Sequence, residues 1–140
     1  GHSKYVDKLR RIIADADITD AVDFIGRTGK VKEHMSRATA FLMCSENEGL
    51  GRVSIEAMFY GCLVIGRNSG GTKDFVLNSK TGLLFDDLDG CIAAMQKVVS
   101  EDNIEIILNA QQFARDNFSI ENYGGKILEV YSKVLNRVIY

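Results

Sequence analysis

The feature that most constrains the fold is an alternation of short apolar runs with helical stretches, joined by connections of a few residues. Residues 39–45 hold the uninterrupted run Ala-Phe-Leu-Met-Cys, and residues 62–66 are similarly apolar. Such runs are typical of strands that are covered on both faces. Residues 31–37 and 53–60, which precede the two runs, have helical patterns. The order predicts an α/β fold, a Rossmann-like parallel sheet with helices on both faces.

Further elements are predicted on either side of this unit. Residues 4–14 have apolar residues at helical spacing, with Ser3 placed to cap the helix. Residues 22–26, Val-Asp-Phe-Ile-Gly, predict another buried strand, and residues 83–85 predict a short one. Because no linker or repeat interrupts the chain, residues 1–140 are predicted to form one domain.

Three helices are predicted at the end of the chain. We expect Asp89, Asp102 and Ser119 to cap them in turn. The last helix carries an apolar stripe that we expect to be packed, formed by Tyr123, Ile127, Val130, Tyr131, Val134 and Val138.

Composition excludes several classes of function. The chain has 46% hydrophobic residues, a net charge of -2 and no dense Lys/Arg tract, so a nucleic-acid partner is not expected. Its three cysteines, Cys44, Cys62 and Cys91, are widely spaced, which suits reduced thiols in the cytoplasm. With only His2 and His34 besides, we expect no metal site.

The predicted sheet indicates where a ligand site would lie. In open parallel sheets, ligands bind beyond the carboxyl ends of the strands. Here those ends are followed by residues 26–29, 45–52 and 67–72.

The segment from Glu48 to Glu56 carries the clearest chemical signal. Gly49 and Gly51 let the backbone approach a ligand, and the helix that follows directs unpaired N–H groups toward it, which suits an anion. The two carboxylates can each accept hydrogen bonds from neighbouring hydroxyls, as in a sugar or ribose, and both can face one pocket. A purely structural interpretation also stands, because glycine turns open helices in many α/β proteins.

These residues resemble a known signature. Glu48 and Glu56, separated by seven residues, lie within residues 45–51, 55–58, 61–66 and 70–71. Together these closely resemble the signature of the retaining GT-B glycosyltransferases of the large group 1 family. Further similarities lie in residues 24–27, in residues 81–85 and at Phe118-Ser119. The resemblance covers nearly the whole chain and implies the carboxyl-terminal, donor-binding half of a GT-B fold, truncated at its start.

The resemblance also implies roles for individual residues. Glu48 would contact hydroxyls of the donor sugar, and Glu56 would hold the ribose. The other positions implied to bind the donor are the base-contacting Gly26, Arg27 and Thr28, the main-chain amides of Gly49, Leu50 and Gly51 near the sugar and diphosphate, and Gly70 and Gly71 beside the cleft.

Two residues are candidates for catalysis. Glu48 could steady positive charge at the anomeric carbon, and Arg52, at the mouth of the helix, could stabilise the leaving diphosphate. For Arg52, a solvated side chain in the first turn is an equal alternative. The resemblance implies no metal cofactor, and Asp87-Leu88-Asp89 is interpreted as a helix start rather than a metal site.

The sequence also departs from the family's pattern. Prolines common there near three positions are replaced by Val53, Leu63 and Lys73. The family's donor domain normally begins with two further strands and a diphosphate-gripping segment with glycine, arginine and lysine, and an amino-terminal acceptor domain precedes it. We therefore expect those parts in cis, and no sugar transfer by this chain alone.

The implied function is transfer of a hexose from a UDP- or GDP-linked donor to a glycan or lipid-linked acceptor. The expected location is the cytoplasm, with peripheral association of the full enzyme at the inner membrane face as a further option. An epimerase-like GT-B enzyme and a non-catalytic nucleotide-binding module stay open as alternatives. A dinucleotide-binding oxidoreductase is disfavoured, because no Gly-any-Gly-any-any-Gly follows the first predicted strand.

Overall fold

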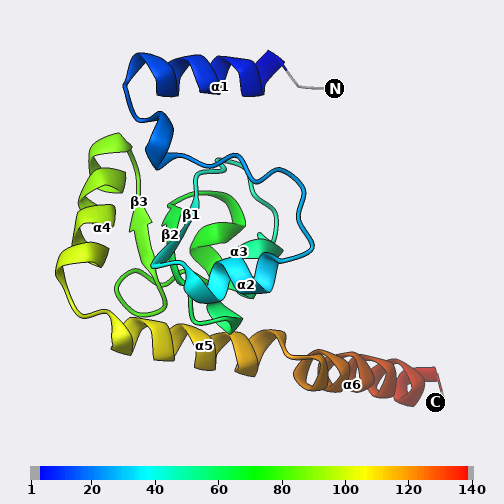
Figure 1. The fold of residues 1–140 in the computed structure, drawn as a ribbon. Helices are drawn as coiled ribbons and strands as arrows, with labels where there is room; N and C mark the ends of the chain where they lie inside the picture. The colour runs from blue at the N-terminus through cyan, green and yellow to red at the C-terminus, as the bar shows by residue number, and fades with distance from the viewer. Residues whose placement is uncertain (1–3, 139–140) are drawn as a thin grey trace.

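The computed structural model describes residues 4–138 and, within the last helix, side chains up to residue 135. Short connections join its helices and strands (Figure 1). In chain order they are α1 (Lys4–Asp15), η1 (Thr19–Ala21), α2 (Val31–Arg37), β1 (Ala40–Met43), α3 (Arg52–Phe59), β2 (Leu63–Arg67), η2 (Gly70–Asp74), β3 (Leu83–Phe85), α4 (Leu88–Ser100), α5 (Ile104–Phe118) and α6 (Ile120–Val138).

A parallel three-stranded sheet in the order β1-β2-β3 forms the centre of the fold. Ala40 lies opposite Leu63 across the first pair, and Ile65 lies opposite Leu83 across the second. Parallel neighbours need crossover connections, which α3 and the segment through η2 provide. The predicted α/β architecture is thereby confirmed.

Helices cover both faces of the sheet. Leu63 and Ile65 of β2 point to one face, where they pack with residues of β3 and α4, including Cys91 and Val98. Val64 points to the other face. The cluster there is formed by Met35, Ile55, Ala57, Met58, Cys62, Val64, Phe75, Val76, Ala110 and Ala114. Burial of a side chain as large as Val64 contributes about 1.5–3 kcal/mol, so the two clusters fix β2 in the middle of the molecule.

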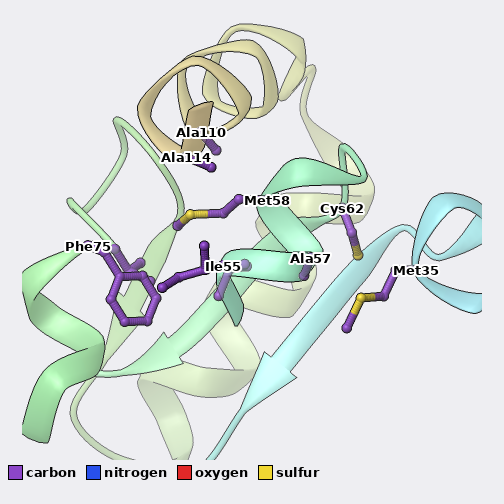
Figure 2. Packing of buried hydrophobic residues seen from close by; sticks show 10 residues of the cluster. Met35, Ile55, Ala57, Met58, Cys62, Phe75, Ala110 and Ala114 are labelled. Atoms are coloured by element: carbon purple, nitrogen blue, oxygen red, sulfur yellow. The ribbon is translucent and has the colours of Figure 1, made fainter. Parts of the chain in front are cut away.

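The contact between α3 and α5 closes the second cluster. Figure 2 shows Met58 of α3 just below Ala110 and Ala114 of α5 in that view, with Ile55 and Phe75 close by. Met58 and Ala114 are fully buried. Small residues on α5 bring the two helices close together, and this packing holds α3 in place from its far side.

The prediction of a strand at residues 22–26 was wrong. The segment forms no strand in the structure, and Phe24 and Ile25 are 40% and 57% exposed. The physical reason is that a strand needs hydrogen bonds to a neighbour, and among the described residues this segment joins no ladder of the β1-β2-β3 sheet. The segment lies instead along a hollow of about 570 Å³ lined also by His34 and Arg37 of α2.

The two terminal helices extend from the body of the molecule (Figure 1). The predicted packing of the α6 stripe was wrong: Tyr123, Val130, Tyr131 and Val134 are all more than half exposed. Helical spacing identifies an apolar face but not the surface that would cover it. The side chain of Val138 lies outside the described ones.

The helix starts agree in part with the predicted caps. Asp87, not Asp89, caps α4, since its Oδ1 accepts from the Gly90 amide at 2.8 Å. Asp102 accepts from the amide of Ile104 at 2.9 Å, and Ser119 accepts from that of Asn122 at 3.3 Å. The helix α4 begins at Leu88, two residues earlier than a cap at Asp89 implies, which makes Asp87 its N-cap residue. Ser3 lies outside the described residues.

Candidate functional site

Two loops meet at the carboxyl edge of the sheet. The loop after β1 and the loop after β2 are joined by a hydrogen bond from the Gly71 amide to the Glu48 carbonyl oxygen at 2.8 Å. A Cβ on Gly71 would overlap the carbonyl oxygen of Gly49, and one on Gly70 would lie 2.6 Å from that of Glu48. Glycine is therefore required at both positions for the loops to approach so closely.

The start of α3 presents unpaired main-chain amides at this edge. Gly51 is the N-cap residue, in the left-handed conformation with φ of 60°. Its carbonyl oxygen accepts from the amide of Ser54 at 2.8 Å. Among the hydrogen bonds of the described residues, none uses the amides of residues 49–53. Free N–H groups and the positive end of the helix dipole make this an anion-binding geometry.

The two glutamates of the predicted site lie in different surroundings. Glu48 is half-buried beside the Gly70 loop, and its Cγ would lie 3.1 Å from a Cβ on Gly51. Glu56 is exposed and lines a cavity of about 280 Å³ together with Leu50 and Arg52. Glu48 is not among the residues that line this cavity, so a single pocket shared by both carboxylates stays a prediction.

The cavity beside Glu56 lies between α3 and the junction of α5 and α6. Its other lining residues, from α3 and the junction between α5 and α6, are mostly apolar and include Phe59, Phe118 and Tyr123. Arg52, the predicted cation, therefore faces a partly apolar hollow as well as the helix mouth.

The predicted base-contacting loop lies at another hollow. Gly26 and Thr28 line a cavity of about 340 Å³ with Val53 of α3 and Phe41 of β1. The Thr28 hydroxyl accepts from the Lys30 amide at 3.0 Å, which shapes the loop before α2. Arg27 does not line this cavity. The first turn of α3 thus has Arg52 at one hollow and Val53 at the other.

Two features of this edge were not found from the sequence. Arg67, the last residue of β2, donates from Nη2 to Oε1 of Glu46 at 2.8 Å. The hydroxyls of Ser54, Ser69 and Thr72 are buried with no hydrogen-bond partner among the described residues. The signal for Arg67 was present, because it ends a buried strand within the predicted ligand loop.

Metal-binding groups do not gather in the described part of the chain: no three His, Cys, Asp or Glu side chains there lie close enough to share an ion. Asp87, within the Asp-Leu-Asp sequence, serves as a helix cap. None of the described helices is long and apolar enough to cross a bilayer.

Several curated relatives of the chain are named as glycosyltransferases. A lipopolysaccharide core mannosyltransferase of Rhizobium leguminosarum bv. viciae is 26% identical over 138 residues, which is 96% of this chain and 39% of the relative. An N-acetylgalactosaminyltransferase of Campylobacter jejuni, which is named for an undecaprenol-linked acceptor, is 31% identical over 82% of this chain and 33% of its own length. The chain thus spans well under half the length of these relatives.

Solved structures share the fold. Anabaena HepE in complex with UDP and glucose superposes with a TM-score of 0.78 and 26% identity, over 92% of this chain and 36% of that one. The model of the family described as "Glycosyl transferases group 1" matches residues 1–115. By this match, by the relatives and by the glycine and glutamate framework at the start of α3, the chain belongs to the group 1 glycosyltransferase family.

Proposed function

We propose that this chain binds the nucleotide-sugar donor of a retaining hexosyltransferase. The observation that carries the proposal is the row of unpaired amides at residues 49–53, which lies between Glu48 and Glu56 and is held by the Gly71 contact. A diphosphate is the anion that this geometry suits, because backbone amides can donate to several of its oxygens at once.

The remaining parts of the donor are assigned around the diphosphate. Glu48 accepts hydrogen bonds from the sugar, and Glu56 accepts them from the ribose. The loop with Gly26, Arg27 and Thr28 takes the base. The UDP and glucose bound to HepE support a UDP-sugar, and the family's range keeps a GDP-sugar as the alternative.

In this proposal the chain lowers the barrier mainly by electrostatics. As the bond to the leaving diphosphate breaks, negative charge grows on the phosphate oxygens and positive charge grows at the anomeric carbon. The α3 amides stabilise the first charge, with Arg52 as an added cation, and the Glu48 carboxylate stabilises the second. We further propose that these groups act without a metal cofactor.

The acceptor is proposed to be a glycan or a lipid-linked glycan, bound by an acceptor domain in cis. The printed names of the relatives support this class, since one acts in lipopolysaccharide core synthesis and another on an undecaprenol-linked glycan. Such an acceptor would bring the full enzyme to the inner face of the membrane from the cytoplasm.

An NMR titration of the chain tests donor binding. UDP, GDP, ADP, UDP-glucose and GDP-mannose are compared at millimolar concentration, and we expect UDP or GDP compounds to shift amide signals of residues 49–53. Glu56→Gln should weaken nucleotide and nucleotide-sugar binding about tenfold, as expected when a charged hydrogen bond is lost. Glu48→Gln should weaken only the nucleotide-sugar.

Glu105→Gln, an exposed glutamate in the first turn of α5, is the control and should bind as the unmodified chain does. If none of the five compounds shifts the amides of residues 49–53, the donor site is wrongly assigned. If both glutamate variants bind the compounds as tightly as the unmodified chain does, the chain is better interpreted as a non-catalytic module that binds nucleotides at another surface.

A further inference from the structure

Arg67 lies at the centre of the carboxyl edge. It is the last residue of β2, the middle strand, and its side chain is about one third exposed, at 35%. The guanidinium forms a 2.8 Å ion pair with Glu46, which lies in the loop that carries Glu48. A cation at this edge therefore contacts the proposed donor loop through its partner carboxylate.

The backbone that carries Arg67 is firmly held. The amide of Asn68 donates to the Phe85 carbonyl oxygen at 2.8 Å, and the Asn68 side chain donates to Asp86 at 3.0 Å. The amide of Ser69 donates to the Arg67 carbonyl oxygen at 2.8 Å. These bonds fix the end of β2 to the end of β3, so Arg67 projects from a rigid base.

The loop that Arg67 contacts has fewer supports. Residues 44–47 are exposed, and among the described residues two polar contacts join residues 44–48 to the end of β2 and the loop after it. One is the ion pair of Glu46 with Arg67, and the other is the hydrogen bond from Gly71 to the Glu48 carbonyl. Glu56 is supported differently, because its helix is packed through the buried Ile55 and Met58.

We propose that Arg67 is a positioning residue for the donor sugar: through its ion pair with Glu46 it fixes the loop that places Glu48. The inference rests on the proposed function, in which Glu48 contacts the sugar and Glu56 the ribose. Loosening the loop should therefore weaken binding of the sugar and leave binding of the nucleotide almost unchanged.

The test compares matched ligands in Arg67→Gln. UDP-glucose is compared with UDP, and GDP-mannose with GDP, by NMR titration of the chain. We expect affinity for the nucleotide-sugar to fall about threefold to fivefold, within the range for a partly exposed ion pair, and affinity for the nucleotide to change less than about twofold. The difference should shrink as salt is raised, because a partly exposed pair is screened.

Three further variants separate positioning from direct contact. Glu46→Gln should give the same selective loss, and Arg67→Gln with Glu46→Gln should give no further loss, because the pair acts as a unit. The exchange Arg67→Glu with Glu46→Arg should restore binding if the pair only positions the loop. Glu101→Gln, which breaks an exposed pair with Lys97 on α4, is the matched control.

Each outcome decides the matter. A selective loss with rescue by the charge exchange supports the inference. Equal losses for nucleotide and nucleotide-sugar, or a charge exchange that folds by circular dichroism but fails to restore binding, overturn it. If the unmodified chain binds none of the four ligands, the proposed function fails and the inference fails with it; if it binds them and Arg67→Gln changes neither affinity, the inference alone fails.

Discussion

Gly71 shows how one residue determines the shape of the candidate site. Its amide donates to Glu48, and a side chain in its place would overlap the Gly49 carbonyl. The resemblance predicted that Gly70 and Gly71 lie beside the cleft, and the structure gives the physical reason that no other residue fits. The donor-binding role of these positions stays a prediction.

Gly71→Ala should destabilise the fold by about 1–3 kcal/mol, since the new Cβ forces the two loops apart. Thermal unfolding followed by circular dichroism measures the change. Gly49→Ala is the control in the neighbouring loop, because a Cβ there has nothing within 4 Å. If the Gly71→Ala protein unfolds at the same temperature as the unmodified chain, the two loops do not touch as described.

At the scale of elements, what could be predicted from the sequence depended on local signals. β1 lies within the continuous apolar run, and the strand of residues 83–85 has its predicted bounds. Both could be predicted because a buried strand is recognisable from the apolar residues of the strand itself. Residues 22–26 have the same signal but form no hydrogen-bonded ladder in the described part of the chain, and the residues of a segment cannot show whether a partner strand lies beside it. The Arg67–Glu46 pair was missed for a related reason, since its residues belong to separate loops.

Packing between α3 and α5 depends on the small size of Ala114. Ala114→Leu should lower stability by about 1–3 kcal/mol, because extra methyl groups push α5 away from Met58. Urea unfolding measures this change. Ala93→Leu, on the exposed side of α4, adds the same atoms and should have little effect. Equal effects of the two substitutions would contradict the close α3–α5 contact.

For the whole molecule, the cysteines report on both faces of the sheet. Cys62 belongs to the cluster around α3, Cys91 belongs to the one under α4, and Cys44 is exposed. Burial raises the pKa of the Cys62 thiol, and burial together with nearby Cys44 raises the pKa of the Cys91 thiol. Both groups therefore form less of the reactive thiolate than an ordinary cysteine, and reagents reach these two buried thiols less easily than they reach the exposed Cys44.

An aromatic disulfide reagent at pH 8 should thus react quickly with one thiol of the folded chain and with all three after denaturation. Absorbance of the released thiolate counts them. Cys44→Ser should remove the fast phase and leave the slow ones. Rapid reaction of all three thiols under native conditions would mean that the two clusters are not closed.

The one-sided pairing of β1 affects how the molecule behaves in solution. Its outer edge offers a row of N–H and C=O groups next to the apolar residues Phe41 and Leu42, and among the described residues no strand occupies it. Such an edge is a template for a foreign strand, whether from a longer polypeptide or from another molecule. Self-association at high concentration would compete with the folded monomer, so dilute samples best preserve the ligand edge of the sheet.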